Sequence, residues 1–156
     1  MQPSPPLLSL IRRCEGFRPH TYTDLAGHPT IGYGHRLLPH EVFPDGLTPE
    51  AAEALLARDA DRAAEAVTRL VHAPLTQGQF DALVDFVFNL GPERLASSTL
   101  LRLLHQGCAE AAGQQLLRWD RAAGQPNAGL RARRQAEFAL WKRPAPADAP
   151  KTEPAA

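Results

Sequence analysis

The stretch E-G-F-R-P-H-T-Y-T-D-L-A-G-H-P-T-I-G-Y-G-H, residues 15–35, decides how the N-terminal part of this chain folds. An apolar run with helical spacing ends at Glu15, and Gly16 follows it, which predicts a helix that stops there. The β-forming residues 21–33 are interrupted by a turn at Gly27, which predicts a small hairpin. One short segment therefore leads from a helix into β-structure.

Three polar side chains of this stretch have the chemistry of a glycosidase. Cleavage of a glycosidic bond needs a carboxylic acid that protonates the leaving oxygen and an ionised carboxylate on the other side of the bond. Glu15 lies at the negative end of a helix dipole, which favours its protonated form, whereas Asp24 lies on an exposed hairpin and is expected to stay charged. The hydroxyl of Thr30 can hold a water beside Asp24. Ordinary surface charges would explain the same spacing.

The middle of the chain predicts two longer helices. Thr48 and Pro49 form an N-cap with proline in the first turn, and the apolar stripe behind them runs to about residue 71, as expected of a long connecting helix. Thr76 begins a capping box in front of a strongly apolar segment that ends at Gly91. We expect this second helix to form the centre of the core.

The C-terminal part predicts shorter helices and a tail. The expected elements are a short helix from Ser97 or Ser98 to Gly107, another at 109–119, a loop at 120–129 and a final helix at 130–141. The Pro- and Ala-rich residues 144–156 cannot bury apolar surface, so we expect them to form a disordered tail.

Composition and charge exclude several classes of protein. The chain has 156 residues, 44% hydrophobic and 6% aromatic, which favours one α-rich globular domain. Seventeen basic and seventeen acidic residues give no reason to expect binding to nucleic acid or an anionic membrane. No apolar run approaches the roughly 20 residues of a membrane span, and no secretory signal is recognised. The basic residues between 118 and 143 are expected to form a solvated helix face, with a surface for an anionic polymer as the alternative.

The sequence as a whole resembles one known family. Glu15, Asp24 and Thr30, spaced by nine and six residues and followed by I-G-Y-G-H, resemble the Glu-Asp-Thr signature of the phage-type lysozymes or endolysins, glycoside hydrolase family 24. L-T-Q-G-Q-F-D-A-L-V-D-F-V-F-N-L-G at 75–91 is similar to the central buried helix of that family, and G-L-R-A-R-R at 129–134 to its C-terminal segment. The resemblance covers roughly residues 7 to 142.

The resemblance implies an α+β fold, mostly α, with two lobes. Residues 1–143 would form a single lysozyme domain, divided into a small β-hairpin lobe at 16–47, a connecting helix at 48–71 and a helical lobe at 72–143 that includes the N-terminal helix. The substrate would be bacterial peptidoglycan, cut by hydrolysis of the β-1,4 bond between N-acetylmuramic acid and N-acetylglucosamine. No metal or organic cofactor would be required.

The resemblance also implies roles for single residues. Glu15 would be the general acid, and Asp24 with Thr30 would position or activate the attacking water, which favours an inverting course. His35 would be a structural histidine paired with an acid rather than a proton shuttle. The weaker substrate-binding candidates, with their alternatives, are Phe88 (core), Asn89, Ser98 (helix cap) and Arg131 (helix surface), the last expected across the cleft from Glu15.

Two other functions are compatible with the same resemblance. A lytic transglycosylase would break the same bond with one essential acid, and an inactive glycan-binding module would keep the fold alone. We expect a monomer that accumulates in the cytoplasm of the host bacterium and reaches the cell wall through a separate pore-forming holin, without inserting stably in the membrane.

Overall fold

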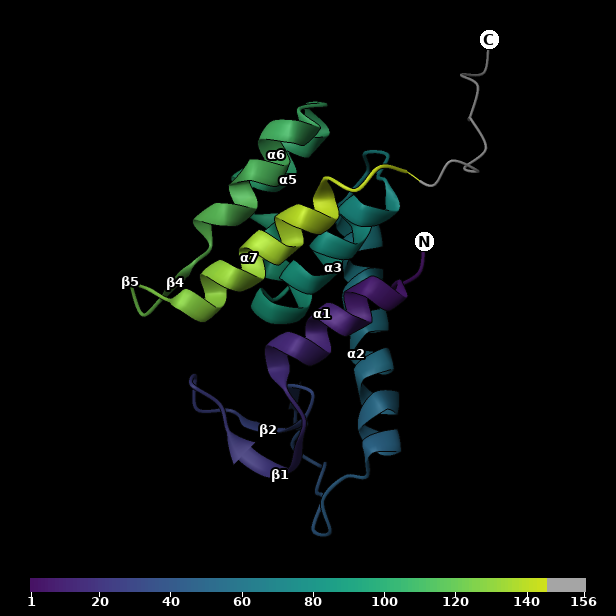
Figure 1. Cartoon of the computed structure of the whole chain (residues 1–156), viewed down its shortest axis with the longest axis vertical. Coiled ribbons are helices and arrows are strands. Elements are labelled where there is room, and N and C mark those ends of the chain that lie inside the picture. The colour runs from purple at the N-terminus through teal and green to yellow at the C-terminus, as the bar shows by residue number, and fades with distance from the viewer. Residues whose placement is uncertain (146–156) are drawn as a thin grey trace.

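The computed structural model describes residues 1–145 and shows two lobes joined by a long helix, α2 (Figure 1). Strands β1 and β2 lie at one end of the molecule, and most helices lie at the other. This is the mostly helical α+β arrangement that the sequence predicted. The predicted tail lies outside the described residues from residue 146 onwards.

The small lobe contains a three-stranded antiparallel sheet instead of the predicted two-stranded hairpin. Its strands are β1 (Arg18–Thr23), β2 (Pro29–Gly32) and β3 (His35–Arg36), in the order β1-β2-β3. Thr30 in the middle strand faces Tyr22 on one side and Arg36 on the other. A strand of two residues is too short to show an alternating pattern, so β3 was not predicted.

Helices α1 (Pro5–Glu15) and α2 (Pro49–Leu70) begin and end close to where the sequence predicted. Gly16 ends α1 with a φ of 69°, and the hydroxyl of Thr48 accepts a hydrogen bond from the backbone N–H of Ala51 at 3.1 Å. The left-handed backbone of Gly16 turns the chain into β1, which brings Glu15 to the junction of the two lobes.

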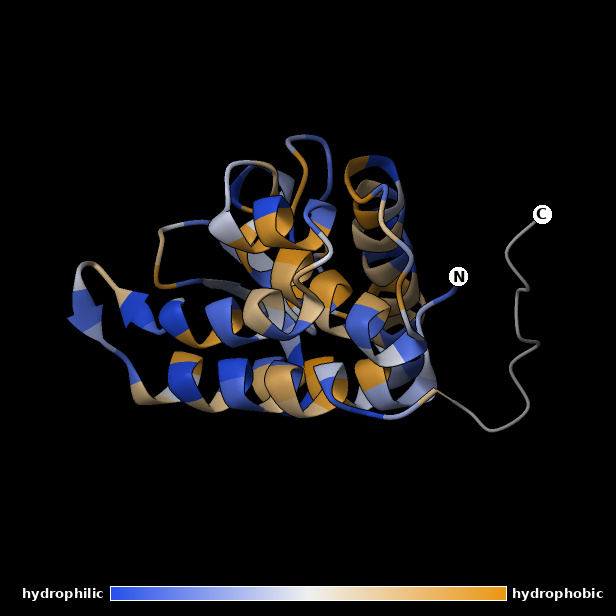
Figure 2. Cartoon of the chain, turned by 90° about the horizontal axis from the view of Figure 1, so that it is seen from above, coloured by the Kyte–Doolittle hydropathy of each residue, from blue (hydrophilic) through white to orange (hydrophobic). Residues whose placement is uncertain are grey.

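Helix α3 (Gln77–Leu90) is the centre of the core, as predicted. Thr76 and Gln79 form the reciprocal capping box, with hydrogen bonds of 2.9 and 3.2 Å. Apolar residues gather where the helices face each other (Figure 2). Two acids of α3, Asp81 and Asp85, are nevertheless fully or almost fully buried. A buried carboxylate must find partners, so these two residues indicate polar networks inside the helical lobe.

The rest of the helical lobe consists of short elements and one longer helix. They are α4 (Pro92–Ala96), α5 (Thr99–His105), α6 (Ala109–Gln115), the 3-10 turn η1 (Leu116–Arg118), the two-residue strands β4 (Arg121–Ala122) and β5 (Gln125–Pro126), and α7 (Ala128–Trp141). The predicted helix at 109–119 therefore tightens after Gln115, and the predicted loop at 120–129 contains a minimal hairpin. Gly91 and Pro92 predict the end of a helix, but Pro92 also begins the next helix, α4.

The basic C-terminal region is not a uniformly solvated helix face. Arg133 and Arg134 of α7 are 5% and 0% exposed, and Glu137 on the same helix is 0% exposed. The expectation of a solvated face is wrong for these arginines because the buried acids Asp85 and Glu137 lie within reach of them. Buried charged side chains therefore form part of the contact between α3 and α7.

At one end of that contact, Gly78 of α3 lies against the backbone carbonyl of Leu140 in α7. We predict that Gly78→Ala lowers the free energy of unfolding by about 1–3 kcal/mol, because a methyl group there collides with backbone that cannot rotate away. Gly129→Ala is the control, since that exposed helical position faces only the side chain of Asn127 at 3.3 Å. Chemical denaturation measures both variants, and equal stabilities would contradict the close packing of α3 on α7.

Candidate active site

A cavity of about 520 Å³ brings the three predicted catalytic residues together between the lobes. We call it the Glu15 cavity; its lining includes Glu15, Arg18, Tyr22, Asp24, Thr30, Gly34, Arg36, Phe88 and Asn89. The residues come from α1, the small sheet and the end of α3. Helix α1 supplies one carboxylate and the hairpin supplies the other, so the two acids face the same space from different elements.

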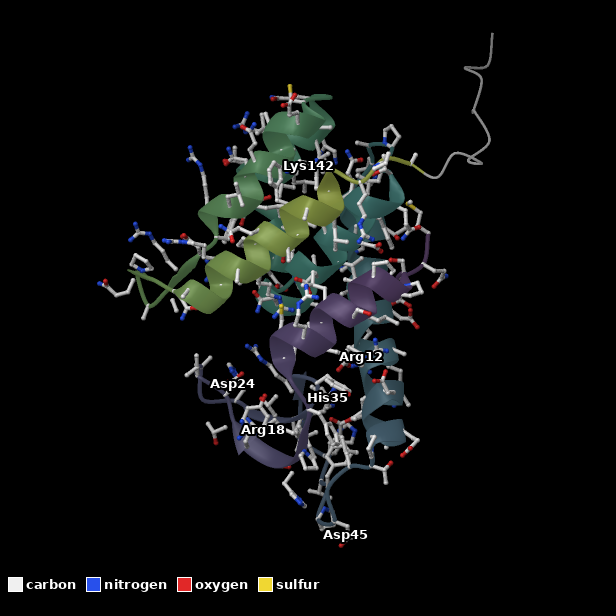
Figure 3. The ribbon with its side chains drawn as sticks, viewed as in Figure 1. Arg12, Arg18, Asp24, His35, Asp45 and Lys142 are labelled. Atoms are coloured by element: carbon white, nitrogen blue, oxygen red, sulfur yellow. The ribbon has the colours of Figure 1, made fainter. Side chains whose placement is uncertain are left out.

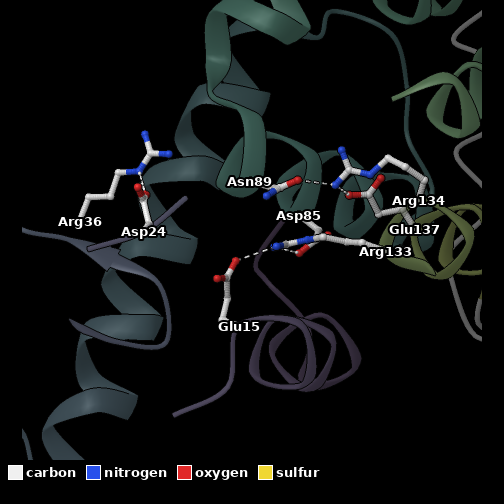
Figure 4. Close-up of polar contacts among 8 residues, drawn as sticks. All are labelled: Glu15, Asp24, Arg36, Asp85, Asn89, Arg133, Arg134 and Glu137. Atoms are coloured by element: carbon white, nitrogen blue, oxygen red, sulfur yellow. Dashed lines mark hydrogen bonds and ion pairs between the residues drawn. The ribbon is translucent and has the colours of Figure 1, made fainter. Parts of the chain in front are cut away.

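Glu15 is the last residue of α1, and its side chain is 20% exposed. Its Oε1 accepts a hydrogen bond from Nη1 of Arg133 at 2.6 Å (Figure 4). A Cβ at Gly34 would lie 2.6 Å from the other oxygen, Oε2, and Gly34 has a φ of 75°. Glycine is needed at this position both for its backbone conformation and for the close approach of the carboxylate. Arg133 and Gly34 together restrict where the Glu15 carboxylate can lie.

Arg133 takes the place that the sequence assigned to Arg131. Its Nε and Nη2 donate to the two oxygens of Asp85, both at 2.9 Å, while Nη1 reaches Glu15. Arg131 is directed elsewhere: its side chain is 57% exposed, and its Nε lies 3.3 Å from Asp120. The expectation that Arg131 lies across from Glu15 is therefore wrong. Two residues along a helix turn a side chain to the opposite face, and spacing alone did not distinguish the three arginines.

Asp24 lies at the turn between β1 and β2 and is held by backbone donors. Its Oδ1 accepts hydrogen bonds from the N–H groups of His28 at 2.8 Å and Ala26 at 2.9 Å. Its Oδ2 lies 3.3 Å from Nε of Arg36. The hydrogen bond from the backbone of His28, with the nearby charge of Arg36, lowers the pKa of Asp24. This agrees with the prediction that Asp24 stays ionised.

Thr30 is 2% exposed, and its hydroxyl donates to the backbone carbonyl of His28 at 2.9 Å. The same carbonyl accepts the N–H of Asp24 at 2.9 Å. This carbonyl therefore ties Thr30 to the turn that carries Asp24. Because the single O–H is used as a donor, the oxygen of Thr30 can only accept a hydrogen bond from a molecule in the cavity.

His35 is buried between two acids on the side of the small lobe that faces α2 (Figure 3). Its Nδ1 lies 2.7 Å from Asp59 of α2, and its Nε2 lies 2.8 Å from Glu41 in the loop after β3. The hydrogen bond to Asp59, with that to Glu41, raises the pKa of His35. Both ring nitrogens are occupied by these partners, which is the structural arrangement predicted for this residue.

The candidate substrate-binding residues occupy different places. Phe88 and Asn89 line the Glu15 cavity, and Oδ1 of Asn89 accepts a hydrogen bond from Arg134 at 2.8 Å. Ser98 is not part of this lining; its hydroxyl donates to the carbonyl of Leu95 and accepts from the N–H of Leu101 as the cap of α5. Helix capping, the alternative for Ser98, accounts for both of these hydrogen bonds.

Comparison with known proteins gives this site its family. The family model described as phage lysozyme matches residues 12–137, which span Glu15, the small sheet and most of α7. The chain belongs to this family. The resemblance noted in the sequence is confirmed, and the chain is a glycoside hydrolase of the lysozyme type.

The similarity to other members of the phage lysozyme family extends over nearly the whole chain. The endolysin of Acyrthosiphon pisum secondary endosymbiont phage 1 is 39% identical over 140 residues, which are 86% of this chain and 94% of that protein. The endolysin of Salmonella phage P22 is 37% identical over 144 residues, 90% of this chain and 98% of the other. Among solved structures, the muramidase domain of SpmX from Asticaccaulis excentricus superposes with a TM-score of 0.80 at 39% identity, covering 90% of this chain and 97% of that one.

Within residues 1–145 of this phage lysozyme family member, no group of three or more His, Cys, Asp or Glu side chains is arranged to hold a metal ion. None of the helices in the same range combines the length and the apolar character needed to cross a bilayer.

The pH dependence of stability follows from the acid pair around His35. Because the pKa of His35 is raised, its stabilising contribution is complete below the unfolded value of about 6.5 and is lost as the pH rises through the folded value. The lowered pKa of Glu41 works in the other direction, so its contribution is complete above about 4.5 and is lost in stronger acid. We predict that His35→Asn destabilises the protein most between about pH 4.5 and 6.5.

Urea unfolding of both proteins near pH 5.5 and pH 9 measures this difference. His20→Asn is the control, because His20 is an exposed histidine of the same lobe. A destabilisation by His35→Asn that is equal at the two pH values would show that His35 is not charged in the folded protein.

Proposed function

We propose that this chain is an endolysin that hydrolyses the β-1,4 bond between N-acetylmuramic acid and N-acetylglucosamine in bacterial peptidoglycan and so lyses the cell. The observation that carries the proposal is that Glu15, Asp24 and Thr30 line one cavity between the lobes. Endolysins and a muramidase domain among its relatives support the same substrate.

Glu15 is the general acid in this proposal. Arg133 donates to Oε1, so that oxygen is already an acceptor and the proton for the leaving group belongs on Oε2. Oε2 lies beside Gly34, whose missing side chain leaves room for this carboxylate oxygen, and both residues line the Glu15 cavity. The role requires a proton on Oε2 of Glu15 at the moment of reaction, while Oε1 keeps its contact with Arg133.

Asp24 and Thr30 act on the attacking water. Ionised Asp24 accepts a proton from the water, and the oxygen of Thr30 accepts a second hydrogen bond from it, which fixes its orientation. A water between the two carboxyl groups gives inversion at the anomeric carbon. The anomer that is formed first, read by proton NMR during digestion of a soluble peptidoglycan fragment, distinguishes inversion from retention.

The cavity wall formed by Phe88 and Asn89 supplies contacts to the sugars. An aromatic ring presents an apolar face to a pyranose ring, and an amide can bond to its N-acetyl and hydroxyl groups. Arg131, exposed on α7, is available to negatively charged groups of the polymer. Ser98 caps α5 and has no sugar contact in this proposal.

The biological setting of the proposal is a monomer that accumulates in the bacterial cytoplasm. A separate holin releases it to the cell wall, where it meets its substrate. A lytic transglycosylase would leave anhydromuramic ends without adding water, so mass spectrometry of the digested peptidoglycan separates that reaction from hydrolysis.

Three substitutions in the Glu15 cavity are predicted to reduce hydrolysis by graded amounts. Glu15→Gln and Asp24→Asn each remove a proton-transfer group and should lower kcat about 10²- to 10⁴-fold. Thr30→Ala removes an orienting oxygen and should cost less, about tenfold to a hundredfold. The loss of turbidity of permeabilised Gram-negative cells measures the rates.

Glu50→Gln is the matched control, because Glu50 is an exposed acid in the first turn of α2. Circular dichroism confirms that every variant is folded. Cells cleared by folded Glu15→Gln as fast as by the parent protein would exclude Glu15 as the general acid.

A further inference from the structure

A buried polar cluster lies directly behind Glu15, between α3 and α7 (Figure 4). It begins at the cavity with Glu15, continues through Arg133 to Asp85, and ends at Glu137 and Arg134. Asp85, Glu137 and Arg134 are all 0% exposed, and Arg133 is 5% exposed. These four buried groups must therefore find their partners inside the cluster, whereas Glu15 also faces the cavity.

The cluster contains one carboxyl group more than it has cations. Arg133 and Arg134 are the two guanidinium groups, and Glu15, Asp85 and Glu137 are the three carboxyl groups. Asp85 and Glu15 both accept hydrogen bonds from Arg133. Among the described residues, Arg133 donates no hydrogen bond to the third carboxyl group, Glu137.

The surroundings of the Glu137 carboxyl group indicate that it carries a proton. Oε1 of Glu137 lies 2.7 Å from Nη2 of Arg134, but within the described residues neither of its oxygens receives a properly directed hydrogen bond. An ionised carboxylate can only accept, so two buried oxygens without donors would be costly. A protonated Glu137 has an O–H that donates to the adjacent Asp85. Burial, with the charge of Asp85, raises the pKa of Glu137 well above its usual range.

We propose that Glu137 is a positioning residue for the general acid: as a neutral carboxylic acid it donates a hydrogen bond to Asp85, which keeps Asp85 oriented for Arg133 and thereby keeps Arg133 on Glu15. The role in catalysis rests on the proposed function, whereas the proton on Glu137 does not. Glu137 does not line the Glu15 cavity, so it acts on Glu15 through Asp85 and Arg133 rather than by touching the substrate.

The same cluster extends to the cavity wall through Arg134. Its Nη2 donates to Asn89 at 2.8 Å, and its guanidinium carbon lies 5.4 Å from the centre of the Phe86 ring. Nε and Nη1 of Arg134 find no acceptor among the described residues. The cation–π contact with the Phe86 ring therefore stabilises a guanidinium group that makes few hydrogen bonds. Arg134 therefore joins Glu137 to Asn89 in the wall of the Glu15 cavity.

The ionisable groups that face Glu137 come from three helices. Arg133 and Arg134 lie on its own helix, α7; Asp85 faces it from α3; Glu15 and Cys14 lie at the end of α1, beyond Arg133. Among these groups, Asp85 is the hydrogen-bond acceptor for the proton of Glu137.

A direct test measures the proton on Glu137 in the unmodified protein. Carbon-13 NMR of protein labelled at the glutamate carboxyl carbons gives one signal for Glu137, assigned by its loss in Glu137→Gln. We expect this signal to have the chemical shift of a neutral acid at neutral pH, because burial and the charge of Asp85 raise the pKa of Glu137 well above its usual range. The chemical shift of an ionised carboxylate at neutral pH would overturn the proposal, whatever the enzyme does to peptidoglycan.

A pair of variants tests the positioning role. Glu137→Gln keeps an N–H donor for Asp85 and an oxygen toward Arg134, so kcat and the pH profile should stay within about threefold of the parent. Glu137→Met has a similar volume but no donor, and should lower kcat about tenfold or more. It should also move the alkaline limb of the kcat/KM profile to higher pH, because a carboxylate that loses its cationic partner binds a proton more tightly.

Glu65→Met, at an exposed position of α2, is the control for introducing a methionine. A lesion that is only structural would lower stability without moving the pH profile, and that result would overturn the positioning role. Activity lost equally in Glu137→Gln and Glu137→Met would overturn it as well, because it would mean that the negative charge is needed. If the parent protein failed to cleave peptidoglycan, the proposed function would be wrong, and the NMR titration would still decide the state of Glu137.

Discussion

The burial of the Arg133 guanidinium is the constraint on which the rest of the site depends. An arginine that is 5% exposed must find partners for its donors, and three of them are used by Asp85 of α3 and Glu15 of α1. Helices from three parts of the sequence are thereby tied at one point. The planar guanidinium group also fixes the orientation of the Glu15 carboxylate in the cavity.

The small lobe forms the opposite side of the same cavity, and its polar side chains are held in place in a different way. There the polar groups are held by the backbone: two N–H groups of the turn bind Asp24, and the carbonyl of His28 binds Thr30. Behind the sheet, the pairs that His35 makes with Asp59 and Glu41 fasten β3 to α2 and to the following loop. The two lobes therefore hold one acid each, and the long helix α2 sets how they are joined.

Local signals in the sequence predicted most of the elements, because caps, glycines and apolar periodicity act over a few residues. The ends of α1 and α2 and the capping box of α3 are examples. The cavity residues Glu15, Asp24 and Thr30 were also identified, since they lie in one short segment. Their catalytic roles and those of the candidate sugar contacts stay predictions.

The partners that depend on tertiary packing were not predicted. The sequence alone does not distinguish Arg131, Arg133 and Arg134. The rotation of α7 against α3 decides which of these arginines contacts Glu15. One signal was present: Asp85 interrupts the apolar run of α3, and a buried acid requires a cation nearby. Strand β3 and helix α4 are too short to produce a pattern of their own.

The most direct measurement of the central claim is the hydrolysis rate of Arg133→Lys beside that of Arg131→Lys. Lysine keeps the charge but cannot bind Asp85 through two donors while also reaching Glu15. We predict that kcat on purified peptidoglycan falls about a hundredfold in Arg133→Lys. Arg131→Lys, at an exposed position, should stay within about twofold of the parent. Parent-like turnover by Arg133→Lys, or an equal loss in the two variants, would contradict the claim that Arg133 holds Glu15, the proposed general acid, in place.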